Sequence, residues 1–246
     1  MTTFTYSLRL CAIGAIALLG SYSFACANLI TKANAIDIAA KEAYERNYDI
    51  TWLYVSKNET FWEIFPDFWK FNNHSFTELN DELNKVRASR GYWCVYFLAY
   101  SNTTEQDIAI MLDDSTGAVL YIWEEKSREK VKKHAGNHVI TLGNAIEIAD
   151  KKAVEFGDDI CGRYYEVTYN TPPWSGYSSK RSTEVKSFIV NSYGTFYDHI
   201  EKHNYWDVKY LNIKPVHDGG LQIFVDADNG DVFFKADSFT FLPPPP

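Results

Sequence analysis

The sequence has few cysteines and, after its N-terminal residues, no long apolar run. Only four of its 246 residues are cysteine. Beyond Leu19, no stretch approaches the roughly 20 apolar residues that a membrane-spanning helix needs. The sequence also has no Gly-x-Ser-x-Gly elbow, phosphate-binding loop or Gly-rich dinucleotide motif. These absences predict a protein without a transmembrane segment after its signal peptide, and they leave no signature of a particular reaction.

Basic residues are in deficit. The chain has 24 Lys and Arg against 32 Asp and Glu, which gives a formal net charge of −8. Nucleic acids and anionic lipids are bound by stripes of Lys and Arg, so we expect neither as a partner. A basic protein partner fits this charge better, although mild acidity also simply keeps a protein soluble.

The first 27 residues have the pattern of a secretory signal peptide. They contain one basic residue, Arg9, then an apolar run over 10–19, then small residues that end at Ala27. We therefore predict export to the periplasm or the medium. Acylation of Cys26, which would make a lipoprotein, is the alternative. It is disfavoured by Ser23, because such sites usually carry Leu three residues before the cysteine.

Two cysteines, Cys94 and Cys161, remain once the signal peptide is removed. In an oxidising compartment two cysteines allow a single intramolecular disulfide, which we predict here. Two buried free thiols are the alternative, and the distance between the two residues decides between them.

The later part of the chain contains one pattern twice, over Tyr92–Ile122 and Tyr205–Phe234. Both segments open with Tyr-Trp and close with a turn that contains glycine. The same 24 positions separate Trp93 from Gly117 and Trp206 from Gly230. Each segment has three runs typical of strands, and Asn229-Gly230 is typical of a tight hairpin turn. We predict an antiparallel three-stranded meander in each repeat.

A helix is predicted ahead of each meander, over 31–43 and 141–153. Thr31 and Thr141 are suitable N-cap residues, because their hydroxyls can accept hydrogen bonds from the first turn. Each helix has an apolar stripe at helical spacing. Asp37 stands four residues before Lys41, the favourable order for an ion pair on a solvated helix face. The residues of the stripes are Ile36, Ala39, Ala43, Ile146, Ala149 and Ala153.

The predicted fold is α+β, with two tandem repeats that each pack a helix and a short second helix on one face of an antiparallel meander. The connecting segments add strands over 51–56 and 164–169 and short helices over 75–87 and 195–203. The predicted domains are a signal peptide (1–27), repeat 1 (28–125), a charged linker (126–138), repeat 2 (139–241) and a proline tail (242–246).

Repeat 2 resembles a PepSY domain. The resemblance lies in Ala145-Ile-Glu-Ile-Ala149 and Val225-Asp-Ala-Asp-Asn-Gly-Asp-Val232, whereas repeat 1 departs from it at 112–119. PepSY domains are exported and non-catalytic, and they are proposed to inhibit or regulate peptidases. The same repeat is also similar to small immunity proteins with a nuclear-transport-factor-like fold. This resemblance lies in Trp206, Gly219-Gly220 and Gly230. Both resemblances imply a non-enzymatic protein-binding module, without a cofactor, that acts on a peptidase or protects against a secreted toxin.

Two histidine pairs have the i, i+4 spacing of metal ligands on a helix. His199 and His203 lack the order of a zinc-peptidase motif, and no third ligand stands close to them in sequence. His134 and His138 lie on either side of a glycine. We therefore predict no metal site, and an exported hydrolase or metal-dependent enzyme that uses these pairs remains the alternative.

Aromatic residues are concentrated over 61–71, where six of eleven residues are Phe or Trp. Such clusters are typical of protein-binding hot spots. The alternatives are a packing role between the two repeats, and a carbohydrate- or envelope-binding surface. The predicted partner-binding residues are Phe61, Trp62, Phe65, Phe68 and Trp69.

Overall fold

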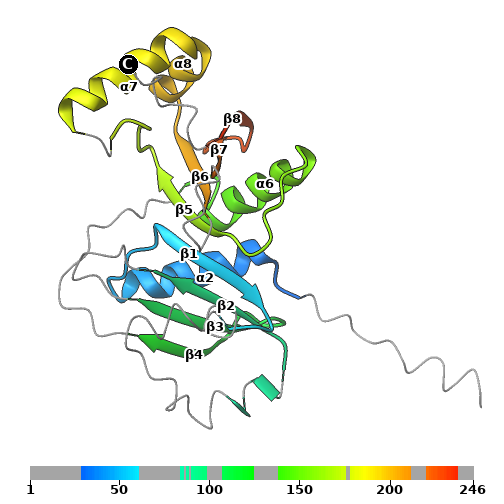
Figure 1. Ribbon diagram of the computed structural model, residues 1–246. Coiled ribbons are helices and arrows are strands. Elements are labelled where there is room, and N and C mark those ends of the chain that lie inside the picture. The colour runs from blue at the N-terminus through cyan, green and yellow to red at the C-terminus, as the bar shows by residue number, and fades with distance from the viewer. Residues whose placement is uncertain are drawn as a thin grey trace, which may run out of the picture.

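Within the residues that the structure describes, eight strands form one antiparallel sheet, and together with the helices they give an α+β fold (Figure 1). The computed structural model describes residues 29–60, 84–85, 87–88, 90–98, 107–124, 138–175, 178–211 and 220–237. The helices are α2 (Lys32–Glu45), α6 (Leu142–Glu155), α7 (Ser179–Ser192) and α8 (Gly194–Lys202). The strands are β1 (Trp52–Lys57), β2 (Tyr92–Phe97), β3 (Ile108–Asp113), β4 (Val119–Glu124), β5 (Tyr164–Tyr169), β6 (Tyr205–Leu211), β7 (Leu221–Asp226) and β8 (Val232–Asp237).

The sheet order is β4-β3-β2-β1-β5-β6-β7-β8. The first half (29–124) contributes α2 and β1 to β4, and the second half (138–237) contributes α6, β5, α7, α8 and β6 to β8. Each half therefore runs outward from the centre of the sheet. The sequence predicts a meander in each repeat, and the structure joins the two meanders into one sheet through β1 and β5.

The helices α2 and α6 begin at the predicted caps. The Thr31 hydroxyl accepts a hydrogen bond from the Asn34 amide at 3.1 Å, and the Thr141 hydroxyl accepts one from the Asn144 amide at 3.2 Å. The predicted apolar stripes are fully buried. Their alanines let both helices lie close to the sheet.

The closing hairpins of the two halves make the same contacts. Gly117 and Gly230 both have positive φ, at 72° and 81°, which favours glycine. A Cβ atom on Gly230 would lie 3.1 Å from the Ile148 side chain, so the turn packs directly on α6. The indole nitrogen of Trp206 donates to the carbonyl of Ile140, just before this helix, at 2.8 Å. Trp93 donates in the same way in the first half.

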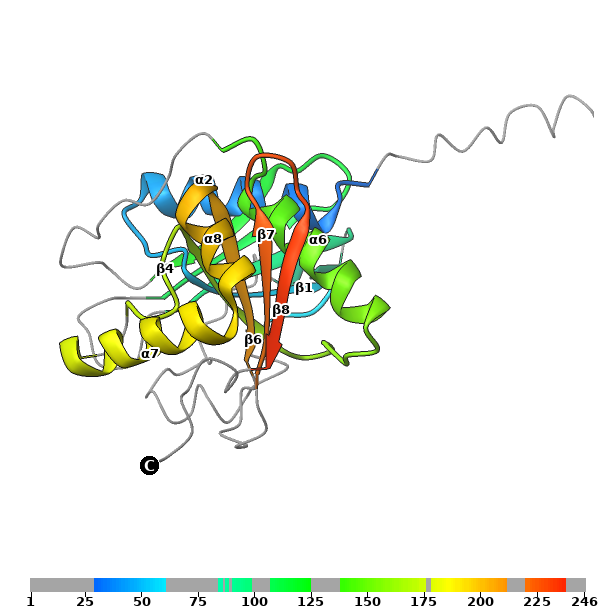
Figure 2. The ribbon, with the colours of Figure 1, turned by 90° about the horizontal axis from the view of Figure 1, so that it is seen from above.

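Helices cover both faces of the second half of the sheet, whereas the sequence analysis predicted helices on one face. Both α2 and α6 pack on one face. Residues of α7 and α8, including Ile189 and Phe196, pack on the other face against Tyr205 and Phe224. Figure 2 shows α8 and α6 on opposite sides of β7 and β8. The reason is that β6 and β7 carry apolar side chains on both sides, and both sides must be covered. The helix α7 is also absent from the predicted elements, so the predicted set of helices was incomplete.

The two halves meet where α2 and α6 cross. A Cβ atom on Gly143 would lie 2.1 Å from the carbonyl oxygen of Ala33, so the two helix backbones almost touch. Asp37 accepts hydrogen bonds from the Thr141 hydroxyl at 2.6 Å and from the Gly143 amide at 2.8 Å. The prediction of a solvated Asp37 was therefore wrong, because this side chain caps the neighbouring helix.

A polar cluster lies beside this crossing. The Asp150 carboxylate accepts from the Lys32 ammonium at 2.6 Å and from the Tyr210 hydroxyl at 3.0 Å. The Tyr165 hydroxyl also reaches Asp150, at 3.2 Å. Burial first, and then the Asp150 charge, raise the pKa of both phenols, so both stay neutral. This cluster links α2 of the first half to α6, β5 and β6 of the second.

We expect Gly143→Ala to destabilise the protein by roughly 1–3 kcal/mol or more, because the new methyl group meets backbone rather than a movable side chain. Alanine is otherwise the better helix former, by about 1 kcal/mol. Gly194→Ala is the matched control, because nothing lies within 4 Å of the Cβ position of this glycine in α8. Thermal or urea unfolding measures both variants. Equal stability of the two would show that α2 and α6 are not in close contact.

Candidate functional site

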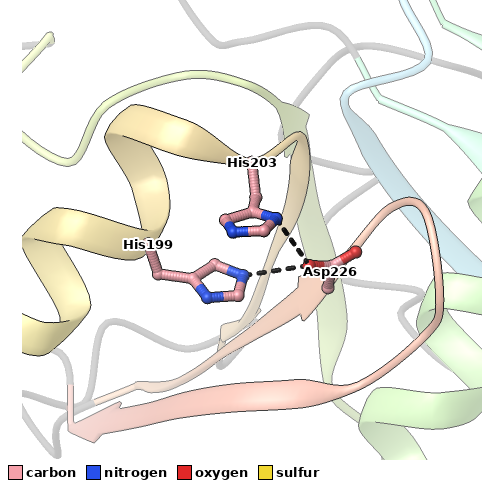
Figure 3. A group of neighbouring side chains, drawn as sticks. All are labelled: His199, His203 and Asp226. Atoms are coloured by element: carbon pink, nitrogen blue, oxygen red, sulfur yellow. Dashed lines mark hydrogen bonds and ion pairs between the residues drawn. The ribbon is translucent and has the colours of Figure 1, made fainter.

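The candidate site is a cluster of His199, His203 and Asp226 in the second half (Figure 3). The sequence indicates the two histidines only as a pair. The structure adds a carboxylate that lies far from them in sequence. Each residue offers one ligand atom, and these atoms lie within 4.8 Å of one another. The predicted partner-binding residues 61, 62, 65, 68 and 69 lie outside the described residues.

Helix α8 positions both imidazoles. Phe196 in its first turn is buried, with its ring centre 4.8 Å from that of Phe224 and 4.3 Å from that of Phe234. This packing holds α8 against β7 and β8. His199 lies in the last turn, and His203 follows the helix and donates its backbone N–H to the His199 carbonyl at 2.9 Å. The two rings are stacked, with their centres 4.3 Å apart.

Asp226 is held from behind by its own hairpin. One carboxylate oxygen, Oδ1, accepts from the backbone N–H groups of Asp228 at 2.9 Å and Asn229 at 3.2 Å. The other oxygen, Oδ2, lies 3.0 Å from His199 Nε2 and 3.6 Å from His203 Nδ1. Burial acts to raise the pKa of Asp226, but these N–H groups and His199 outweigh it and hold the pKa below its ordinary value. Asp226 is therefore an ionised carboxylate aimed at both imidazoles.

The first half has an equivalent aspartate, Asp113, whose carboxylate pairs with a different partner. Asp113 Oδ1 accepts from the backbone N–H groups of Ser115 and Thr116, both at 2.9 Å. The Ser115 hydroxyl also donates to this oxygen, and together these bonds lower the pKa of Asp113. The outer oxygen pairs with the guanidinium of Arg90 at 3.3 Å. In the first half, therefore, a permanent cation faces the hairpin carboxylate.

Position 90 precedes Trp93 by the same interval as position 203 precedes Trp206. His203 thus stands where the first half has Arg90. A guanidinium can only donate hydrogen bonds, whereas an imidazole can also accept a proton or bind a metal ion. His199 adds a second imidazole, at a position that corresponds to Val86. The cluster is therefore special to the second half and is not demanded by the hairpin.

The three side chains differ in access to solvent. The side chain of Asp226 is 2% exposed, whereas those of His199 and His203 are 25% and 49% exposed. Phe233 of β8 stacks on His199, with ring centres 3.8 Å apart, and fixes the orientation of this imidazole. Within the described part of the chain, neither imidazole hydrogen bonds to a serine, threonine or cysteine side chain. The arrangement resembles a ligand set with one solvent-facing side rather than a nucleophile with its base.

His138, from the second histidine pair, has a packing role. Its ring centre lies 3.8 Å from that of Tyr169 and 5.2 Å from that of Trp206. Burial lowers the pKa of His138, which favours the neutral form. Its predicted neighbour in the pair, His134, lies outside the described residues.

The two cysteines are free thiols in the structure, where Cys94 is buried in β2 and Cys161 is exposed after α6. Both lie near the Tyr54 hydroxyl. Burial raises the pKa of Tyr54 first, and Glu59 and the two thiols raise it further. The predicted disulfide has no support in this arrangement and stays a prediction.

A second perturbed carboxyl lies on the α8 side of the sheet. Asp207 of β6 faces Phe224 across the strand pair and is fully buried. The Gln222 side-chain amide donates to both of its oxygens at 2.8 Å, and the Lys209 ammonium lies 3.9 Å away. Burial outweighs these partners and raises the pKa of Asp207 to about 7. The repeat pattern does not indicate this carboxyl, because the first half has Cys94 at the corresponding position.

No protein-family model matches the chain, and no curated protein matches it. Among solved structures, a candidate lipoprotein of Clostridium difficile 630 is similar over 61% of this chain and 74% of its own, with 14% identity and a TM-score of 0.24. Within the described ranges, no helix is both long and apolar enough to cross a membrane.

We expect a thiol reagent to label only Cys161 in native protein without residues 1–27, because Cys94 is buried. Unfolding should expose Cys94 and give a second labelled thiol. Mass spectrometry of the labelled protein gives both counts. If unreduced, unfolded protein contains no reactive thiol, then the two cysteines are paired as the sequence predicts.

We expect Asp207→Asn to change the pH dependence of stability. In the wild-type protein the raised pKa keeps Asp207 protonated when folded, whereas the unfolded carboxyl ionises near pH 4. The unfolding free energy contributed by this group therefore falls as the pH rises from about 4 to 7, by up to about 4 kcal/mol. The variant lacks this loss, so its stability relative to wild type should increase over that range. Urea unfolding at pH 5 and pH 8 measures it, and an identical difference at both would refute the assignment.

Proposed function

We propose that the chain is an exported, non-enzymatic protein-binding module of the PepSY-like kind, which inhibits or regulates a peptidase. The observation that carries this proposal is the contact between the two motif segments in the second half. Ile148, in the helix motif, lies 3.1 Å from the Cβ position of Gly230, in the hairpin motif. Segments more than 70 residues apart in the sequence thus pack against each other, which supports treating them as one motif.

The first half supports the same proposal. Its hairpin glycine, Gly117, approaches Ile38 of α2, and Trp93 donates to the carbonyl of Ile30. The backbone N–H of Ile30 donates to the Asp114 carbonyl at 2.7 Å, as Ile140 does to Ala227 in the second half. These matched contacts are what two PepSY-like repeats would share. Export rests on the signal-peptide pattern of residues 1–27.

The partner is a protein in this proposal, and the predicted contact is the aromatic segment. Trp62 and Trp69 are the strongest candidates, because tryptophan dominates hot spots. A secreted toxin is the rival partner, since the resemblance to immunity proteins points there. An acidic chain of this net charge favours a basic partner surface of either kind.

The test is inhibition of a thermolysin-type metallopeptidase. We expect the protein to lower the rate of peptide hydrolysis in a saturable way. Trp62→Ala should weaken the binding free energy by about 2 kcal/mol or more, which raises the inhibition constant about 30-fold. Excess zinc in all samples ensures that removal of the peptidase's metal is not mistaken for inhibition. Heat-unfolded protein is the control for competition as a substrate. Unchanged hydrolysis by several such peptidases at excess protein would reject this partner class.

A further inference from the structure

We propose that His199, His203 and Asp226 bind one divalent transition-metal ion of the zinc type. The inference goes beyond protein binding and does not depend on it. It rests on the convergence of three side chains, in which His199 Nε2 and His203 Nδ1 both lie close to Asp226 Oδ2. Figure 3 shows both ring nitrogens directed at the same carboxylate oxygen.

The distances between the donor atoms suit a tetrahedral ion. With metal–ligand bonds of about 2.0–2.1 Å, two ligands of such an ion lie about 3.3 Å apart. The carboxylate oxygen of Asp226 lies 3.0 Å from the His199 nitrogen and 3.6 Å from the His203 nitrogen. One nitrogen of each imidazole and one Asp226 oxygen lie within 4.8 Å of one another. Small side-chain rotations therefore bring three donors to binding distance.

The donor types select the ion. Two imidazole nitrogens and one carboxylate oxygen suit zinc, cobalt, nickel and copper, whereas calcium and magnesium prefer oxygen ligands. Three protein ligands leave a further position open, and the exposed His203 places that position toward solvent. An incoming ion can reach the site without opening the fold.

The surroundings hold the ligands in place, as the outer contacts of metal sites do. Two backbone N–H groups bind the inner oxygen of Asp226 and leave its outer oxygen for the ion. Phe233 stacks on His199 and limits the rotation of its ring. The Phe196 contacts fix α8, which carries His199 and ends at His203. The site is therefore built before the ion arrives.

An ion pair alone does not explain the second imidazole. In the first half Arg90 is a sufficient partner for the outer oxygen of Asp113. One protonated histidine would serve Asp226 equally well. Two protonated rings stacked 4.3 Å apart would repel each other. A metal ion instead uses two neutral imidazoles and one carboxylate at the same time, which fits all three residues.

Calorimetric titration of Zn²⁺ into tag-free protein tests the proposal, with Co²⁺ absorption spectra as a readout of tetrahedral coordination. We expect one ion per chain in the wild type. His203→Arg should weaken binding by at least about 100-fold, because it removes a ligand rather than an outer contact. This variant copies the Arg90–Asp113 pair, so its melting temperature without metal should stay at the wild-type value. His199→Ala should weaken binding to the same extent.

The matched control is His138→Phe, which removes a histidine from a ring stack elsewhere and should leave zinc binding unchanged. Two outcomes would overturn the proposal: a wild-type Kd weaker than about 1 mM, or unchanged affinity in both ligand variants. The titration contains no peptidase. Its failure therefore leaves the protein-binding proposal standing, and a failed inhibition assay leaves the metal site standing.

Discussion

The close contact between α2 and α6 at Gly143 is the constraint on which the arrangement of the two halves depends. Strands β1 and β5 pair through only two residue pairs, Trp52 with Glu166 and Leu53 with Tyr165, whereas β5 and β6 pair through six. The strand pairing at the centre of the sheet is thus its shortest, and the helices must supply the rest of the contact. They can do so only where glycine lets the two backbones approach. Asp37 then completes the contact, because it accepts from the Thr141 hydroxyl and from the Gly143 amide in the first turn of α6.

The hairpin aspartates, Asp113 and Asp226, show how a carboxylate that closes a turn can also bind a second group. In both halves the inner carboxylate oxygen closes the turn by accepting from backbone N–H groups, which is what the fold requires. The outer oxygen is left over and needs a cation. Arg90 provides one in the first half. In the second half histidines take that place, so a change of partner converts a structural carboxylate into part of a ligand set.

Much of the fold could be predicted from local pattern. The caps at Thr31 and Thr141, the apolar stripes and the hairpin glycines each act within a few residues of chain, and each is where the sequence places it. The helix α7 could not be predicted, because only two of its residues, Val185 and Ile189, are buried. Two residues are too few to form an apolar stripe at helical spacing. The joining of the two meanders into a single sheet could not be predicted, because the β1–β5 pairing connects segments that carry no repeated motif.

The candidate site could not be predicted from the sequence for a related reason. The histidine spacing is visible in the sequence, but nothing there places Asp226 beside the two histidines, and a sequence does not show which oxygen of a carboxylate is already used. The signal that could have found it is the correspondence of Arg90 with His203, which marks a charged partner exchanged for a metal-binding one. Asp207 gave no such signal, because its raised pKa comes from burial under the α7–α8 side of the sheet, and burial there depends on helices that the local pattern did not reveal.

A bound ion would matter beyond the three residues that hold it. Two of its ligands lie in α8 or directly after it, and the third is on β7, so the ion would join the helix to the sheet at its C-terminal end. The Phe196 contacts hold the same helix near its N-terminal end. With both ends fixed, α8 and the adjoining α7 would keep one position over β6 to β8. An ion at 100 times its Kd stabilises the folded state by about 2.7 kcal/mol. That energy would act on the layer formed by α7 and α8, and the affinity of any partner that binds this layer would depend on the ion.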